Sequence, residues 1–144
     1  MRIVDVVSAK PSQVVVTVTP QATVREFIAT LAEHNVGAAV VSGDGAAVHG
    51  IVSERDVVRR LNEDPNVLDA PVSAIMTSEV HVCDPEDSVE KLMRQMTDHR
   101  VRHVPVVVDG ALSGIVSIGD VVKSRIGELE FERDQLNSYV AGTH

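Results

Sequence analysis

The chain has 144 residues, of which 44% are hydrophobic and 2% aromatic, and its formal net charge is −8. So few aromatic rings disfavour nucleic-acid readers that stack bases on aromatic side chains, and the acidic balance disfavours polyanions such as DNA. A small anionic ligand in a locally basic pocket is compatible with both observations.

The sequence contains no apolar run near the ~20 residues needed to span a bilayer, and its first residues lack the apolar core of a signal peptide. We therefore expect a cytoplasmic protein. Cys83 is the only cysteine, which excludes an intramolecular disulfide and a zinc site built from several thiolates. It lies in the strand-like run 80–83, where we expect a small buried apolar side chain.

The first predicted elements are a Val-rich strand at residues 14–18 and an amphipathic helix after it. Thr23 and Glu26 have the spacing of a capping box, which marks the start of this helix. The apolar face of the helix has helical spacing and consists of Val24, Phe27, Ile28 and Leu31.

A hairpin and a second helix complete this first unit. Two apolar runs, 38–42 and 47–52, are joined by a tight turn that contains Asp-Gly, which is typical of hairpin strands. The second helix is predicted to begin at Ser53. The order of elements is therefore strand, helix, strand, strand, helix.

The second half of the chain repeats this pattern. Residues 85–111 align with 20–46 and, after one extra residue in the first turn, 114–122 match 50–58 at seven of nine positions. The repeated helix face consists of Val89, Leu92, Met93 and Met96. The repeated strands are predicted at 80–83, 103–108 and 112–116, with a helix beginning at Ser117.

Neither copy is large enough to be stable by itself, because a unit of about 50 to 60 residues buries only about 60% of its unfolded surface. We expect the two copies to pack face to face. Residues 72–76 echo 3–7 as a short leader, and the linker 62–71, with two prolines and three acids, suits an exposed crossing. The predicted units are a first repeat with its leader at 1–68, a second repeat at 69–124, and a C-terminal helix and tail at 125–144.

One motif closes both copies: Ser53 and Asp56 in the first, Ser117 and Asp120 in the second. Each pair lies at a strand-to-helix junction, where free backbone N–H groups and the helix dipole favour a phosphate. An Asp in the first turn can also accept hydrogen bonds from a ribose diol. Ser-x-x-Asp is equally a plain capping box that needs no ligand, so both interpretations stay open.

The duplicated order of elements, with Gly-h-h-Ser-x-x-Asp in each copy (h, hydrophobic), resembles a tandem pair of cystathionine-beta-synthase (CBS) domains, often called a Bateman module. The run Val-Arg-His-Val-Pro-Val-Val at 101–107 is similar to the second-strand signature of that family. The resemblance covers nearly the whole chain and is closest to small stand-alone bacterial members. It implies an α+β fold in which two β-α-β-β-α repeats pack about a pseudo-twofold axis.

The resemblance also implies the ligands and the residues that hold them. Family members commonly bind AMP, ADP, ATP, S-adenosylmethionine or NAD in the clefts between repeats. Asp56 and Asp120 would then bind ribose hydroxyls. The other residues expected near the ligand are Ser53 and Ser117 for ribose or phosphate, Val16 and Val82 beside the base, and Arg102 and His103 for phosphate.

The two copies differ in charge. The second has Arg102 and His103 where the first has Gly37 and Ala38, whereas the first has Arg55 where the second has glycine. If a cleft combines the motif of one copy with the second strand of the other, the two sites are unequal. We therefore expect a single preferred site that involves Arg55, Arg102 and His103, against the alternative of a solvated strand start without a ligand.

The histidines and serines do not predict metal binding or catalysis. Among six histidines only His99 and His103 have ligand-like spacing, and they flank a helix end; His144 is terminal. No nucleophile motif or phosphate-loop lysine is present. We expect no metal, no obligatory cofactor and no enzymatic activity.

The C-terminal segment 121–140 predicts a long helix with an apolar stripe of about 3.5-residue spacing and acidic residues around it. The stripe consists of Val122, Ile126, Leu129, Leu136 and Val140, with Arg133 at one seam position. Such a stripe favours a homodimer contact, although a helix that covers its own core is the alternative.

Taken together, these features predict a regulatory module that binds an adenine nucleotide, senses energy state and signals to a partner protein, without acting on nucleic acid or membranes. The alternative is a ligand-independent dimerisation scaffold. The identity of the ligand, the number of occupied clefts, the target protein and the orientation of the dimer remain open.

Overall fold

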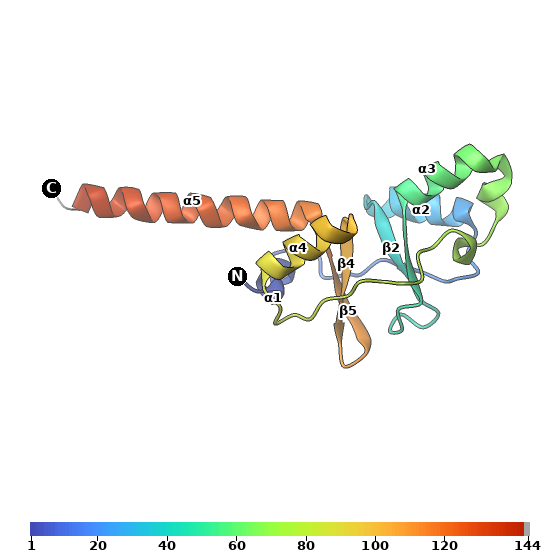
Figure 1. The fold of residues 1–144 in the computed structure, drawn as a ribbon, viewed down its shortest axis with the longest axis horizontal. Helices are drawn as coiled ribbons and strands as arrows, with labels where there is room; N and C mark the ends of the chain where they lie inside the picture. Colours follow the sequence, from blue (N-terminus) through green and yellow to red (C-terminus); the bar gives the residue numbers. More distant parts are fainter. Residues whose placement is uncertain (143–144) are drawn as a thin grey trace.

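The computed structural model describes residues 1–142 as two α+β units side by side, with one long helix projecting from the second (Figure 1). This confirms the predicted fold class. The elements in chain order are α1 (Ile3–Ser8), β1 (Thr17–Val18), α2 (Val24–His34), β2 (Ala38–Val41), β3 (Gly50–Ser53), α3 (Glu54–Glu63), α4 (Val89–His99), β4 (His103–Val108), β5 (Ala111–Ser117) and α5 (Ile118–Gly142). Two 3-10 helices, η1 (Pro65–Asp69) and η2 (Val72–Ala74), connect the units.

The sheet of the first repeat has the predicted topology. β1 pairs parallel with β2, and β2 pairs antiparallel with β3. In the second repeat β4 and β5 form the matching hairpin, but residues 80–83 contribute only a single parallel bridge, from Cys83 to Val106. The prediction of a full strand there is wrong.

Proline explains the missing strand. In the first repeat the N–H of Val40 donates to the carbonyl of Val16, at 3.3 Å. The aligned position in the second repeat is Pro105, which has no N–H to donate to the carbonyl of residue 81. The remaining ladder consists of two bonds at Cys83, whose thiol is buried as predicted. Burial, with Asp87 and Asp84 nearby, raises the pKa of that thiol to about 12, so it is an inert core residue.

The short leaders exchange between the repeats. Ile3 and Val6 of α1 are buried in the core of the second repeat, whereas Val72 and Ile75 are buried in the core of the first. Backbone bonds follow the same exchange: the N–H of Ile3 donates to Asp87 O at 2.9 Å, and that of Val72 to Ala22 O at 2.7 Å. Each core is therefore complete only when both halves of the chain are present.

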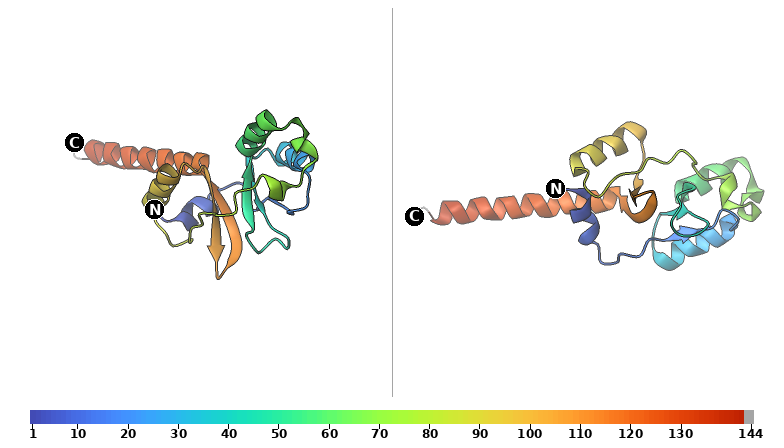
Figure 2. Two further views of the ribbon diagram at one scale, coloured as in Figure 1. Left: turned by 45° about the vertical axis from the view of Figure 1, so that its right-hand side comes forward. Right: turned by 90° about the horizontal axis from the view of Figure 1, so that it is seen from below.

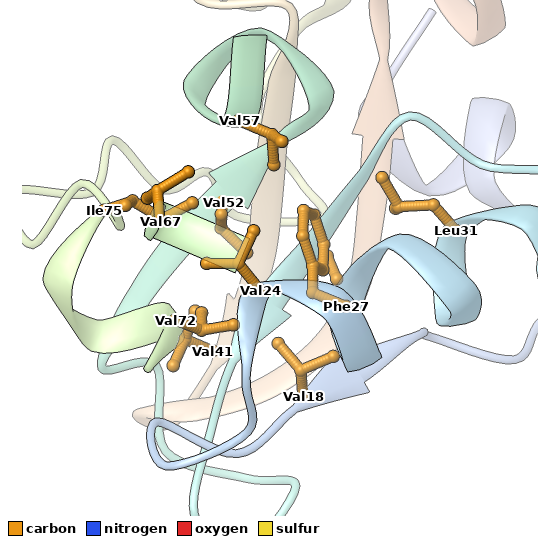
Figure 3. Packing of buried hydrophobic residues seen from close by; sticks show 11 residues of the cluster. Val18, Val24, Phe27, Leu31, Val41, Val52, Val57, Val67, Val72 and Ile75 are labelled. Carbon is orange, nitrogen blue, oxygen red and sulfur yellow. The ribbon is translucent and has the colours of Figure 1, made fainter. Parts of the chain in front are cut away.

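The linker 62–71 is not the fully exposed crossing that its composition suggested. Val67, within η1, is buried in the first core, and Figure 3 shows it there with Val72, Ile75 and Phe27. The unit boundaries at 68/69 and 124/125 remain predictions for the division of the sequence into units. In space the two cores take residues from both sides of the first boundary.

Helix α5 is continuous over 25 residues, and only its first turns pack against the body (Figure 2). Val121 is buried, whereas Val122, Ile126, Leu129 and Leu136 are each at least half exposed. The alternative in which this stripe covers its own core is therefore wrong. Within residues 1–142 no helix combines the length and the apolar character needed to cross a bilayer.

Candidate functional site

Both Ser-x-x-Asp motifs cap helices, as the plain interpretation predicted. Asp56 Oδ2 accepts from the backbone N–H of Ser53 at 2.9 Å, and Asp120 Oδ2 accepts from that of Ser117 at 2.9 Å. The serine hydroxyls accept in return from the N–H of each Asp. Among residues 1–142 nothing bonds to Oδ1 of Asp56, so this oxygen can still accept from a ligand. Capping and ligand binding are compatible at this carboxylate.

A cavity of about 610 Å³ lies between the repeats and takes its lining from both. The first repeat supplies Ser53, Arg55 and Asp56 from the start of α3, and the second supplies the segment from His99 to His103. The connecting segment contributes Thr77, Glu79, Val80 and His81. The cleft thus combines the Ser-x-x-Asp motif of the first copy with the segment that leads into β4 of the second. It brings together Arg55, Arg102 and His103.

The charge of this cleft is opposite to that of the whole chain. Its lining includes four guanidinium groups, from Arg55, Arg59, Arg100 and Arg102, against the carboxylates of Asp56 and Glu79. None of the four arginines forms an ion pair with any residue in the described range 1–142. Guanidinium groups that are not paired within the protein are chemically suited to an anion with several oxygen atoms.

Two histidines form one part of the wall. The rings of His81 and His99 stack with centroids 3.8 Å apart and planes 15° from parallel. His103 belongs to the same lining, and burial, followed by the charge of Arg102, lowers its pKa below the usual 6.5. His103 is therefore a neutral hydrogen-bonding group at pH 7.

A second cavity of about 370 Å³ shares Ser53, Arg55, Arg100, Arg102 and His103 with the first. It extends between the starts of the two motif helices, and its further lining includes Gly37, Glu54, Ser117, Ile118 and Gly119. The positive dipole ends of α3 and α5 therefore face this region, although the N–H groups of Glu54, Asp56, Ile118 and Asp120 already donate within the protein. The shared residues place the starts of both motif helices beside the larger cavity.

The remaining predicted site residues lie elsewhere. Val16 lines a separate hollow of about 210 Å³ with Ile115, and Asp120 lines another of about 190 Å³. Val82 is 43% exposed and outside the lining of the large cavity, although its neighbours Val80 and His81 belong to it. The structure thus brings together five of the nine predicted residues in one cavity and places Ser117 in the adjoining one.

Sequence reasoning missed Arg59, His81, His99 and Arg100 as lining residues. Arg59 could have been predicted from the sequence, because it follows Arg55 by four residues and so lies on the same face of α3. The stacking of His81 on His99 could not have been predicted, since it depends on how the connecting segment passes the end of α4.

The structure does not assemble a metal site in the part of the chain that it describes. No group of three or more His, Cys, Asp or Glu side chains between residues 1 and 142 is placed to hold an ion. His99 and His103 both line the large cavity but do not belong to such a group, and His144 lies outside the described residues.

Comparison with known proteins identifies the same duplication. The CBS domain family matches residues 4–63 and 72–127. The CBS domain-containing protein CBSX3, mitochondrial, from Arabidopsis thaliana is 39% identical over 125 residues, which cover 83% of this chain and 61% of that protein.

Solved structures agree in fold and sequence. The crystal structure of the CBS-domain containing protein ATU1752 from Agrobacterium tumefaciens has a TM-score of 0.83 and 40% identity, covering 87% of this chain and 99% of that one. The CBS domain protein PAE2072 from Pyrobaculum aerophilum, complexed with AMP, has a TM-score of 0.73 and 31% identity, covering 83% and 89%.

Proposed function

Because the chain belongs to the CBS-domain family and carries two copies of the domain, we propose that it is a regulatory module that binds a phosphorylated adenine nucleotide between its repeats. Proteins of this family are generally regulatory and non-catalytic. The module makes and breaks no bond and needs no obligatory cofactor. Its output is a change in the packing of its two repeats.

The observation that carries the proposal is the large cleft with four unpaired arginines beside the free oxygen of Asp56. Its volume lies within the ~300 to 1,000 Å³ that is usual for small-molecule sites. A ribose diol donates to Oδ1 of Asp56, the base lies against Val80 and His81, and phosphate oxygens accept from Arg55, Arg102 and His103. The AMP complex of the Pyrobaculum relative supports this class of ligand.

Charge separates the candidate ligands. AMP, ADP and ATP carry one to three phosphate groups, which match the converging guanidinium groups. S-adenosylmethionine carries a sulfonium cation and no phosphate, so the basic lining opposes it. NAD carries two phosphates but is larger, and it ranks behind the mononucleotides.

Ligand binding is transmitted to a partner protein through a change in the packing of the two repeats. A ligand that touches α3 of one repeat and β4 of the other favours the arrangement to which it binds better. The adjoining cavity also contains Ser117 and Ile118, where α5 begins, so phosphates there contact the start of the projecting helix. We assign the signal to this helix, with an unidentified target protein in a cytoplasmic setting.

The same helix is proposed to pair with a second copy of the chain. Val122, Ile126, Leu129 and Leu136 form one exposed stripe, and Arg133 interrupts it at a seam position. Glu130 and Glu132 flank the seam, so pairing along it brings each Arg133 beside carboxylates of the other copy. Charge complementarity therefore favours a second copy over an unrelated apolar partner.

Isothermal titration calorimetry with AMP, ADP, ATP and S-adenosylmethionine tests the nucleotide site. The wild-type protein should bind the three nucleotides and not S-adenosylmethionine. Asp56→Asn should weaken binding about 10- to 150-fold, because a hydrogen bond to a charged group contributes about 1.5 to 3 kcal/mol.

The duplication provides a matched control. Asp120→Asn makes the same change of charge at the cap of α5 but lies outside the large cavity, so it should leave nucleotide affinity unchanged. Equal losses in both variants would mean that Asp56 acts only as a cap. Failure of every adenosine compound to bind would favour the ligand-independent scaffold, in which both motifs only cap helices.

A further inference from the structure

The second motif already has an internal cation. Lys10 Nζ lies 3.2 Å from Asp120 Oδ2 and donates a hydrogen bond to the backbone carbonyl of Ile115 at 3.0 Å. Both side chains of the pair are about three-quarters buried, at 25% and 23% exposure. These two contacts hold Lys10, which follows the leader, against β5 and α5 of the second repeat.

Comparison of the two clefts shows what Lys10 changes. In the first, Ile51 and Asp56 line one cavity of about 610 Å³. Their counterparts in the second, Ile115 and Asp120, line two different hollows of about 210 and 190 Å³. Lys10 and Pro11 line both hollows, so the lysine side chain separates what is a single space in the first cleft.

The first cleft has no equivalent barrier. When the leader 3–7 is aligned with 72–76, the position of Lys10 corresponds to Glu79. Glu79 lines the large cavity but carries the same charge as Asp56, so it cannot pair with that carboxylate. Oδ1 is unbonded in both aspartates, but Oδ2 of Asp120 also faces an ammonium group, whereas the carboxylate of Asp56 faces no cation within residues 1–142.

We propose that Lys10 closes the second cleft as an internal occupant and thereby makes the protein a one-site module. Its ammonium takes the place of a ribose hydroxyl at Asp120, and its alkyl chain fills the space beside Ile115. Each remaining hollow is smaller than the ~300 Å³ usual for a ligand site. This inference rests on the proposed nucleotide function for the class of ligand, but not on the occupancy of the first cleft.

Stoichiometry measured by calorimetry with AMP tests the proposal. Lys10→Met keeps the length of the side chain and removes its charge, so this variant should bind one more equivalent of AMP per chain than its parent. The same increment is expected in the Asp56→Asn background, where the first cleft is weakened. Lys91→Met is the control, because Lys91 pairs with Asp87 on the surface, away from both clefts, and its loss should add no site.

The outcomes separate this inference from the proposed function. A wild-type protein that binds no AMP, together with a Lys10→Met variant that binds one equivalent, would overturn the first-cleft site and support closure by Lys10. Two equivalents on the wild type, or no added equivalent in Lys10→Met, would overturn closure. Lys10→Gln repeats the test with a polar side chain if the Met variant does not fold.

Discussion

Single residues decide where the two repeats stop being equivalent. Pro105 stands where Val40 donates a ladder bond, and the first strand of the second repeat is lost. Arg102 and His103 replace Gly37 and Ala38, and the basic groups of both copies meet in one cleft. The charge difference was predicted from the alignment of the repeats. The loss of the strand at 80–83 was not, although Pro105 stands at an aligned position.

Other site residues gave no such signal. Lys10 lies between the leader and β1, where the two repeats have unequal lengths, so the alignment does not indicate that its ammonium meets Asp120. The stacked pair of His81 and His99 depends on the path of the connecting segment. Contacts that depend on the path of irregular backbone, such as these two, could not be predicted from the sequence.

His103 gives a prediction about pH. Burial, followed by the charge of Arg102, lowers its pKa in the folded protein, so the unfolded chain takes up a proton more readily below pH 6.5. This residue therefore adds a loss of stability as the pH falls through that value. Urea unfolding at pH 7.5 and 5.5 should show a smaller loss in His103→Gln than in the wild type. Equal losses would contradict a depressed pKa.

At the scale of elements, the helices and the second hairpin could be predicted. The first sheet was predicted only in part, because β1 begins at Thr17 and not at residue 14, and β3 begins at Gly50 and not at residue 47. The partners of the elements could not be predicted. The capping box of Thr23 and Glu26 forms as expected, and both Asp-Gly turns place glycine at positive φ. Periodicity showed that residues 3–7 and 72–76 are apolar, but not that each is buried by the other repeat. Local spacing identifies a buried face without identifying the surface that covers it.

The exchanged leaders predict a large cost for a small change at the start of the chain. Ile3 is fully buried in the second core, so Ile3→Ala should lower the free energy of unfolding by about 2 to 5 kcal/mol. Ile28→Ala is the matched control, because Ile28 is 39% exposed on α2 and should cost less than half as much. Equal costs in urea denaturation would mean that α1 adds little to the second core.

At the scale of the whole molecule, an acidic chain of net charge −8 concentrates unpaired arginines in a large cleft that both repeats build. Neither repeat has this cleft alone, and neither core is complete without the other repeat's leader. Ligand binding and fold stability are therefore coupled through the same interface. Helix α5 projects from the two repeats, and its apolar stripe is exposed.

The stripe predicts the oligomeric state. Light scattering should give the wild-type protein twice the chain mass of 15.5 kDa, and Leu129→Glu with Leu136→Glu should return it to one chain mass. Phe131→Glu is the control, because Phe131 is equally exposed on α5 but lies away from the stripe. A monomeric wild type, or a double variant that remains dimeric, would contradict pairing through α5.

The most direct test of the central claim is a crystal structure of the protein grown with AMP. We predict one nucleotide per chain in the large cleft, with its ribose at Asp56, its phosphate at Arg102 or His103, and Lys10 still paired with Asp120. A nucleotide bound at Asp120, with the large cleft empty, would contradict it.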